Sequence, residues 1–358
     1  MRPALFEAWR GRYADSPRAI SEHLALARPA LPRRWVSDGR SDFPSGARTV
    51  KRHSARYFAD LATCSLLVSN DIISQHLVDL RWTTHVQCWH GTPLKAIGYD
   101  ETTPKYDAAA HLKRVERDVR TWDFLVSSSP FCTTVFRRAF GYEGPVLETG
   151  LPRNDLLLSE GAAAVRTRVR RLLGLEDDVT AVLYAPTWRD DAKDDEGRFF
   201  QPSMPDFDRL TAALGDRFVV LRRLHKNVRT DRLPSTRGVI DVSTYPEVAE
   251  LFLASDVLVS DYSSAIYDFA VTRKPIVCHA PDLEHYANEL RPLYFDYREW
   301  APGPVTVDDE ELVDVLRPLV AGQVVSSERY ERFRRTFCPW DDGQATQRVV
   351  DAVLPALG

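Results

Sequence analysis

The stretch from Ser255 to Pro275 reads Ser-Asp-Val-Leu-Val-Ser-Asp-Tyr-Ser-Ser-Ala-Ile-Tyr-Asp-Phe-Ala-Val-Thr-Arg-Lys-Pro. Its apolar start predicts a buried strand over 257–259, and the hydroxyl-rich residues that follow predict a turn that opens a helix. Ser263 and Ser264 then stand at the cap and first turn, where backbone N–H groups without helical partners favour an anion. Asp268 follows one helical turn later and could accept hydrogen bonds from ribose hydroxyls. The pattern predicts a phosphate cradle, although an ordinary strand-to-helix connection with a serine cap also explains it.

The composition is that of a folded protein large enough for two domains. The chain has 358 residues, of which 44% are hydrophobic and 27% charged. Its net charge of -4 argues against a nucleic-acid-binding protein. The five cysteines are scattered singly, which suits a reducing compartment. No apolar run is long enough to span a bilayer, and residues 1–25 lack a signal-peptide core, so we expect a cytoplasmic protein with at most peripheral membrane contact.

Short apolar runs alternate with helical stretches along the chain. Several runs are followed by Ser, Gly, Pro or Asn, as expected for parallel strands covered on both faces by helices. Two doubly wound α/β domains are the natural arrangement for such a pattern. We predict strands at residues 65–69, 85–89, 124–127, 146–149, 181–184, 218–222, 257–259 and 276–279.

The pattern also indicates where the domains divide. The segment from Gly150 to Asp155 ends a strand and interrupts the alternation, and a new helical stretch follows it. We therefore expect residues 1–155 to form an N-terminal Rossmann-like domain and residues 156–335 to form a C-terminal one. Residues 336–358 are expected to form a C-terminal helix that packs back on the N-terminal domain.

The segment from Trp89 to Lys95, Trp-His-Gly-Thr-Pro-Leu-Lys, directly follows a predicted strand. Gly91 allows a tight turn, and Thr92 can cap a following helix. His90 is thereby displayed at the carboxyl end of a parallel strand, where ligands of such sheets bind. Its near-neutral pKa suits a general base for a hydroxyl nucleophile, although a histidine that only bonds a neighbouring loop carbonyl fits at least as well. Gly91, Thr92 and Lys95 are candidate substrate ligands.

A second candidate segment closes the strand at 181–184. Within Tyr184-Ala-Pro-Thr-Trp-Arg-Asp190, Thr187 and Arg189 could hold a phosphate or the base of a nucleotide. The neighbouring Trp188 could form a wall of the same pocket or pack in the core. Taken alone, this segment is weakly specific.

Two further segments place cationic or hydroxyl side chains after a strand. In Arg222-Arg-Leu-His-Lys226, alternation puts Arg223 and His225 on one side of an extended chain and Arg222 on the other. Such a strand end would neutralise a diphosphate if it faced a cleft, and would otherwise be solvated surface. Ser243 precedes another helix start, where an anion is again favoured.

Together these motifs resemble those of one family, the CDP-glycerol glycerophosphotransferases, the primase-like and polymerase-like enzymes that build the poly(glycerol phosphate) of wall teichoic acids. The segments Trp89 to Lys95 and Ser260-Asp-Tyr-Ser-Ser264 carry most of the resemblance, because their occurrence in this order is highly specific. The resemblance covers nearly the whole chain. It also includes residues 6–7, 15–20, 68–70, 98, 100, 150–155, 184–189, 221–225, 302–304 and 342–343.

The resemblance implies an α/β fold of the GT-B-like type, with two Rossmann-type doubly wound domains facing across a cleft. The C-terminal domain would bind the nucleotide, and the acceptor would approach from the N-terminal domain. The implied reaction is attack of a hydroxyl of a lipid-linked glycerol phosphate acceptor on the β-phosphate of CDP-glycerol, with release of CMP. The product would be a longer teichoic acid or a related cell-wall or capsule polymer.

The family uses two motif histidines in catalysis, and these match His90 and His225. We expect His90 to act as the base, because it lies on the acceptor-side domain. His225 would then stabilise charge on the diphosphate, with help from Arg222 or Arg223 and from Ser243, Ser263 and Ser264. Exchanging the two roles fits the sequence equally well.

No cluster of residues with metal-ligand spacing is evident, and cationic side chains with helix N-termini can stabilise a departing CMP. We therefore expect neither a metal nor another cofactor. Residues 28–57 contain seven arginines, one lysine and two aspartates, a local charge of +6 with histidine neutral. Such a stretch could approach anionic lipid or a phosphate-rich acceptor at the inner face of the cell membrane, or could simply be solvated surface.

Two other functions fit the same motifs. A related enzyme could transfer ribitol phosphate or another polyol phosphate from a CDP-activated donor, because pocket depth decides which donor is accepted. A GT-B protein could also bind a nucleotide without transferring it and act as a scaffold, since fold alone does not fix function. The presence of His90, His225 and the serine pair argues against a scaffold.

Overall fold

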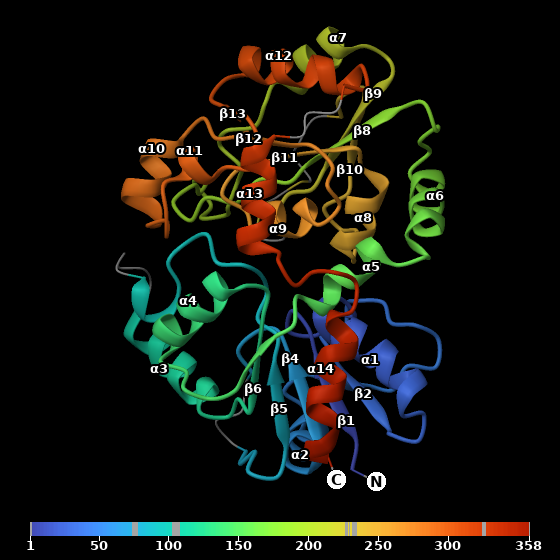
Figure 1. Cartoon of the computed structure of the whole chain (residues 1–358), viewed down its shortest axis with the longest axis vertical. Helices are drawn as coiled ribbons and strands as arrows, with labels where there is room; N and C mark the ends of the chain where they lie inside the picture. Colours follow the sequence, from blue (N-terminus) through green and yellow to red (C-terminus); the bar gives the residue numbers. More distant parts are fainter. Residues whose placement is uncertain are drawn as a thin grey trace.

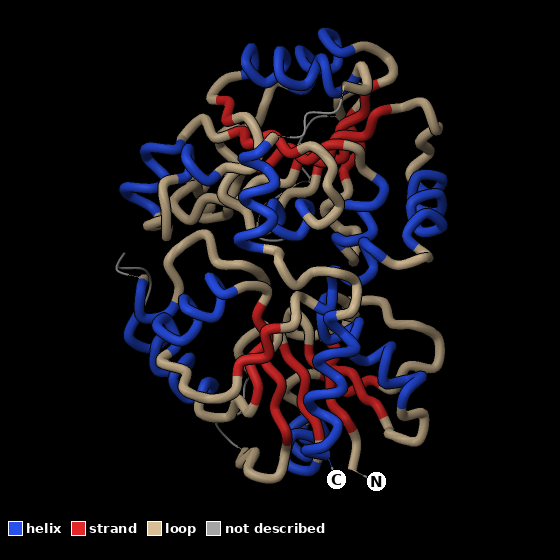
Figure 2. Tube along the Cα trace, viewed as in Figure 1, coloured by secondary structure: helices blue, strands red, loops and turns tan. Residues whose placement is uncertain are grey.

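The computed structural model describes residues 2–73, 78–101, 108–225, 228, 230, 235–323 and 327–357. These residues form two sheets, each built of parallel strands, with helices packed on the faces of each sheet. One sheet lies above the other in the view of Figures 1 and 2. The predicted α/β fold with two doubly wound domains is therefore confirmed. No helix in these ranges is long and apolar enough to cross a membrane.

The strands of the first sheet are β1 (Ala4–Glu7), β2 (Arg33–Ser37), β3 (Thr49–Lys51), β4 (Leu66–Ser69), β5 (Thr84–Gln87), β6 (Phe124–Ser127) and β7 (Val146–Glu148). Their order across the sheet is β3-β2-β1-β4-β5-β6-β7, and all neighbours are parallel. The direction of chain progression reverses between β1 and β4, where Leu5 lies opposite Leu67. Ligands of doubly wound sheets bind beyond the carboxyl ends of the strands at such a point.

The strands of the second sheet are β8 (Thr180–Tyr184), β9 (Phe218–Arg222), β10 (Val239–Asp241), β11 (Val257–Ser260), β12 (Ile276–His279) and β13 (Val305–Thr306). Their order is β10-β9-β8-β11-β12-β13, again parallel throughout. The reversal lies between β8 and β11, where Leu183 is opposite Leu258. The two sheets thus have the same kind of switch point.

Helices occupy the connections between the strands. Those of the first half are α1 (Asp15–Ala27), α2 (Ala55–Thr63), η1 (Gly98–Asp100), α3 (Ala108–Val119) and α4 (Pro130–Phe140). Those of the second half are η2 (Pro152–Asn154), α5 (Asp155–Leu158), α6 (Ala162–Leu172), α7 (Phe207–Leu214), α8 (Val248–Ala254), α9 (Ala265–Ala270), α10 (Leu283–His285), η3 (Tyr286–Leu290), α11 (Tyr297–Trp300), α12 (Asp309–Val320), α13 (Glu328–Phe337), α14 (Ala345–Val353) and η4 (Leu354–Leu357).

The strands form from short apolar runs because both faces of each sheet are covered. Every residue of β1, β4, β11 and β12 is buried. In β4, Leu66 and Val68 belong to the core on one face, whereas Leu67 belongs to the core on the other. This alternation explains why the strands read as continuous rather than alternating hydrophobic stretches.

The chain passes between the two sheets twice, and the two connections bond to each other. The Asp341 carboxylate in the second connection accepts hydrogen bonds from Leu151 N at 2.9 Å and Asn154 Nδ2 at 3.2 Å in the first. The Asp155 carboxylate in the first connection accepts from the backbone of Ala345 at 3.0 Å, where α14 begins. The two connections therefore form one hydrogen-bonded junction.

Helix α14 lies against α1 in the first domain (Figure 1). Val349, Val350 and Val353 are buried in the same core cluster as Ile20 and Leu24 of α1. This packing is consistent with the expected division of the chain. We propose that the boundaries of the two domains and of the C-terminal helix are those predicted, at residues 1–155, 156–335 and 336–358.

Candidate functional site

A cavity of about 240 Å³ lies between the two domains, and we call it the interdomain cavity. The first domain contributes Trp9, Arg12, Asp15, His90 and Arg153 to its lining. The second domain contributes Arg223, His225, Ser243, Ser263, Ser264 and Asp268, among others. Most of these residues follow the carboxyl end of a strand, as expected for a ligand site of two doubly wound sheets. The structure thus brings together seven of the residues predicted from the sequence.

His90 is held in one tautomer at the edge of this cavity. Its Nδ1 lies 2.9 Å from the carbonyl oxygen of Asn70, which can only accept, so Nδ1 carries the proton and Nε2 keeps a lone pair. The ring packs against the indoles of Trp9 and Trp89, with centroids 5.3 and 4.2 Å away. Burial lowers the pKa of His90, an effect that the nearby Asp71 carboxylate opposes. A neutral imidazole with an available lone pair can take a proton from a hydroxyl.

Gly91 allows the histidine loop to approach the second domain closely. Its φ is +140°, a backbone conformation that side chains disfavour. A Cβ atom at this position would lie 3.0 Å from the side chain of Ser264 and from Nη2 of Arg153. The role of Gly91 visible in the structure is therefore close packing across the domain interface.

Two arginines, one from each domain, line the cavity, and so does the Glu247 carboxylate, whose charge raises the pKa of Arg223. Neither Arg12 nor Arg223 forms an ion pair with any residue that the structure describes. Arg223 Nη1 donates instead to the carbonyl oxygens of Val242 at 3.1 Å and Tyr245 at 2.7 Å. Burial lowers the pKa of Arg223 to about 10, so the side chain stays cationic at neutral pH. Two guanidinium groups that no carboxylate of the described residues contacts directly suit an anion with more than one charge.

The remaining predicted residues of the second domain surround these arginines. The His225 ring stacks on Trp188, with centroids 5.3 Å apart and planes at 12°. Ser243 Oγ accepts a hydrogen bond from Leu224 N at 2.9 Å and so holds the loop that carries His225. This serine therefore has a visible structural role in addition to its place on the cavity wall.

The predicted phosphate cradle is smaller than the sequence suggested. Helix α9 has only six residues, so its aligned peptide dipoles contribute less than those of a long helix. Ser263 Oγ accepts from Ala265 N at 3.2 Å, whereas the Ser264 hydroxyl makes no hydrogen bond within the described ranges. Ser264 is thus the hydroxyl that is available to a ligand.

A buried ion cluster joins the two domains beside the cavity. Arg153 donates to Asp15 at 3.0 Å through Nη1 and to Asp268 at 2.8 Å through Nη2, and all three residues are buried. Asn154 Nδ2 donates to the same Asp268 carboxylate at 3.2 Å. The carboxylate predicted to bind ribose is therefore occupied by protein donors, and ribose binding by Asp268 stays a prediction.

Arg189 and Thr187 lie outside the cavity lining. Arg189 is 2% exposed and forms ion pairs with Asp261 at 2.9 Å and with Asp282 at 2.6 Å. The backbone of Thr187 donates to the same Asp261 carboxylate at 2.7 Å. In this structure both residues hold the loop after β8, and binding of a ligand by either one stays a prediction.

Three more predicted ligands also lie outside the lining. Arg222 pairs with Asp241 at 3.0 Å, and the Thr92 hydroxyl is hydrogen-bonded to that of Ser128 at 3.0 Å. Burial lowers the pKa of Lys95 to about 7. These side chains contribute to the interior of the domains or to the interface between them.

Arg12 and Arg153 were not predicted from the sequence. Arg12 lies in the loop after β1, a strand that our predictions omitted. Arg153 lies within the segment 150–155, which we interpreted as a domain boundary and as part of the family resemblance. Both residues could have been predicted from the rule that ligands of such sheets bind beyond the carboxyl ends of the strands. In the described ranges, no group of three or more His, Cys, Asp or Glu side chains could hold a metal ion.

Comparison with known proteins identifies relatives over nearly the whole chain. Residues 2–355 match the family described as CDP-Glycerol:Poly(glycerophosphate) glycerophosphotransferase. A teichoic acid glycerol-phosphate transferase of Staphylococcus aureus is 34% identical over 98% of this chain and 92% of its own length. A teichoic acid poly(glycerol phosphate) polymerase of Staphylococcus epidermidis is also 34% identical over 98% of this chain, but this chain spans only about half of that relative, 50%.

A solved structure of the wall teichoic acid polymerase TagF superposes on this chain with a TM-score of 0.90. The match has 32% sequence identity and covers 99% of this chain and 89% of the TagF chain. Sequence identity and fold therefore agree over the same residues that carry the motifs and the interdomain cavity. On these grounds the chain belongs to the CDP-glycerol:poly(glycerophosphate) glycerophosphotransferase family.

Proposed function

We propose that this protein is a transferase that moves glycerol phosphate from CDP-glycerol to a hydroxyl of a glycerol phosphate acceptor and releases CMP. The observation that carries the proposal is the interdomain cavity, where the neutral His90 imidazole of one domain lies in the same cavity as two unpaired arginines and a free serine hydroxyl. The two relatives described above, a glycerol-phosphate transferase and a poly(glycerol phosphate) polymerase, support glycerol phosphate as the transferred group.

In the proposed reaction, Nε2 of His90 accepts the proton of the acceptor hydroxyl while the hydroxyl oxygen attacks the β-phosphorus of the donor. A phosphodiester bond forms, and the bond from this phosphorus to the bridging oxygen breaks. CMP leaves with that electron pair. Arg12 and Arg223 would stabilise the negative charge on the diphosphate, and Ser264 would donate a hydrogen bond to it.

We assign the base to His90 and charge stabilisation to His225. The fixed tautomer of His90 and its position on the first domain support this order. The test is to replace each histidine by alanine and measure CMP release, with His285→Ala as the matched control at an exposed histidine. Loss of the base should lower kcat by about 10²- to 10⁴-fold. Near-normal turnover by His90→Ala would overturn the assignment.

The donor is tested by measuring CMP release from CDP-glycerol with a glycerol phosphate primer, with CDP-ribitol and a UDP-sugar in parallel. Release from CDP-glycerol alone is expected, and the length of the product then separates primer addition from polymerisation. A preference for CDP-ribitol would keep the chemistry and change the polymer. Tight nucleotide binding without release from any donor would favour the scaffold function.

Turnover is expected to persist in excess EDTA, because Arg12 and Arg223 place fixed positive charge at the proposed diphosphate position. The measurement is initial rate with and without chelator, followed by addition of magnesium. Complete loss of activity that magnesium restores would contradict this prediction.

We also propose that the acceptor is lipid-linked and that the protein associates peripherally with the inner face of the cell membrane. The basic segment 28–57 supports this, although Arg34 and Arg52 within it are neutralised by Asp60 and Glu7. Co-sedimentation with anionic liposomes should weaken when Arg48 and Lys51 are replaced by glutamine. Unchanged co-sedimentation of that variant would count against the proposal.

A further inference from the structure

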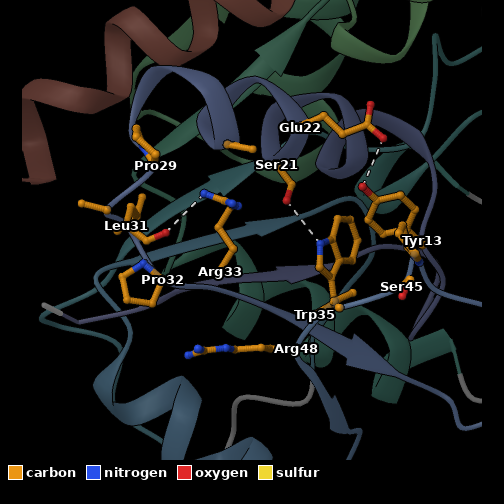
Figure 3. Close-up of a pocket in the computed structure, with 15 residues that line it drawn as sticks. Tyr13, Ser21, Glu22, Pro29, Leu31, Pro32, Arg33, Trp35, Ser45 and Arg48 are labelled. Carbon is orange, nitrogen blue, oxygen red and sulfur yellow. Dashed lines mark hydrogen bonds between the residues drawn. The ribbon is translucent and has the colours of Figure 1, made fainter.

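A second and larger cavity lies wholly on the first domain. Its volume is about 510 Å³, within the range of small-molecule sites, and we call it the α1–β2 pocket. Its walls come from helix α1, from the turn before strand β2 and from residues 44–48 (Figure 3). The side chains that matter for its chemistry are Tyr13, Glu22, Arg33, Trp35 and Arg48.

Two arginines in this pocket lack counter-ions. Arg48 is exposed, and its side chain forms no hydrogen bond or ion pair within the described part of the chain. Among the residues that the structure describes, Arg33 Nη1 donates to carbonyl oxygens alone, those of Leu31 at 3.3 Å and Leu24 at 3.5 Å. The neighbouring Arg34, by contrast, is paired with Asp60. The pocket therefore presents net positive charge, and carbonyl dipoles only partly compensate it.

The acidic group in the pocket is already engaged. Glu22 Oε1 accepts hydrogen bonds from the Tyr13 hydroxyl at 3.1 Å and from Arg18 Nε at 2.9 Å. The indole nitrogen of Trp35 donates to Ser21 Oγ at 3.2 Å, which directs the polar edge of the ring into the protein (Figure 3). The free features of the pocket are thus two guanidinium groups beside aromatic and proline carbon. This combination suits an anion that is flanked by short carbon chains.

The linings of the α1–β2 pocket and the interdomain cavity include two consecutive residues of the chain. Arg12 lines the interdomain cavity, and Tyr13, the next residue, lines the pocket. The pocket belongs to the domain that also carries His90. Arg33 begins β2 and Arg48 precedes β3, at the amino ends of these strands, so an extended ligand with its end beside His90 would pass Arg12 and Tyr13 and follow β2 to reach them.

We propose that the α1–β2 pocket binds a phosphodiester group of a glycerol phosphate chain whose terminal hydroxyl lies in the interdomain cavity. The proposal rests on the proposed function, because it assigns the pocket to the acceptor of that reaction. A phosphate flanked by glycerol is also the headgroup chemistry of phosphatidylglycerol. The pocket's place on the domain that carries His90, with Tyr13 next in the chain to Arg12, favours the acceptor chain.

The test uses the full chain and a soluble glycerol phosphate oligomer of several units. Binding is measured by calorimetry for the wild type, for Arg48→Gln and for Arg33→Gln/Arg48→Gln, at low and at high salt. Arg40→Gln is the matched control, because Arg40 is exposed, lies in the same basic segment and does not line the pocket. We expect Arg48→Gln to weaken binding several-fold and the double variant to weaken it by about tenfold or more. The single variant removes no contact within the described protein, so it keeps the test valid if the double variant folds poorly.

Two further measurements separate this proposal from the function on which it rests. The KM for a long acceptor should rise in the variants, whereas the KM for a single-unit acceptor should change much less. If the wild type releases no CMP, the proposed function fails, but the oligomer titration still tests the pocket. Equal weakening by Arg40→Gln, or no weakening in the double variant, would overturn the proposal. Loss of binding to phosphatidylglycerol vesicles with unchanged oligomer binding would assign the pocket to lipid and also overturn it.

Discussion

At the residue scale, the protonation state of His90 should set the lower pH limit of activity. Burial lowers the pKa of this imidazole below its ordinary value of 6.5. A base works only when neutral, so kcat/KM should stay level as pH falls through 6.5 and should drop only at the lower pKa of the folded protein. The measurement is the profile of kcat/KM from about pH 4.5 to about pH 8, which covers the range in which histidines titrate. An acid limb centred above pH 7 would contradict the assignment.

The two unpaired arginines of the interdomain cavity lead to a second prediction about individual residues. Arg12→Gln and Arg223→Gln should each weaken binding of CDP-glycerol by about 10- to 100-fold, because each removes a charged hydrogen-bond donor. Binding is measured by calorimetry with a non-reacting CDP compound. Arg298→Gln is the matched control, since Arg298 is exposed and does not line the cavity. Unchanged affinity in both variants would place the diphosphate elsewhere.

Residues that line the interdomain cavity were predictable when they follow an evident strand within a few positions. His90, His225, Ser263 and Ser264 do so, and all four line the interdomain cavity. Arg189 also follows a strand, but its buried pairing with Asp261 and Asp282 depends on residues more than 70 positions away. Local pattern carries no information about such partners, so it could not separate a structural arginine from one that is available to a ligand.

At the scale of elements, the Asp15–Arg153–Asp268 cluster joins α1, η2 and α9. Replacing Arg153 by methionine keeps the length of the side chain but leaves two buried carboxylates without their cation. We expect a loss of about 3–5 kcal/mol in the free energy of unfolding, measured by urea denaturation at pH 7. Adding Asp268→Asn should recover part of that loss. A loss no larger than that of Arg298→Met would contradict the prediction.

The elements themselves were predictable to different degrees. The eight predicted strands all appear, since each is an apolar run whose two faces are covered. Strand β1 was omitted although every residue of it is buried, because the charged Glu7 ends its apolar run and is buried only through distant partners, Arg52 and Tyr57. Strands β2, β3, β10 and β13 were also omitted. Charged residues begin β2, and β3 has only one buried residue, so neither has the expected pattern; their pairing comes from neighbouring strands.

At the scale of the whole molecule, α14 completes the core of the first domain although it follows the second in sequence. Val350 is 3% exposed within that core. Val350→Ala should therefore lower the free energy of unfolding by about 1–3 kcal/mol, because it removes buried methyl groups and leaves a small cavity. Asp351→Ala on the exposed face of the same helix is the control. Equal stability of the two variants in urea denaturation would show that α14 is not part of the core.

The two connections between the domains determine what a protease cut would do. A single cut in the loop between α6 and β8 would leave one fragment with β1 to β7 and another with the second sheet and α14. The second fragment would retain the valines that complete the core of the first, together with Asp341, which bonds Leu151 and Asn154. The halves of the cut chain would therefore hold each other by buried surface, and the nicked protein should behave as an assembled heterodimer.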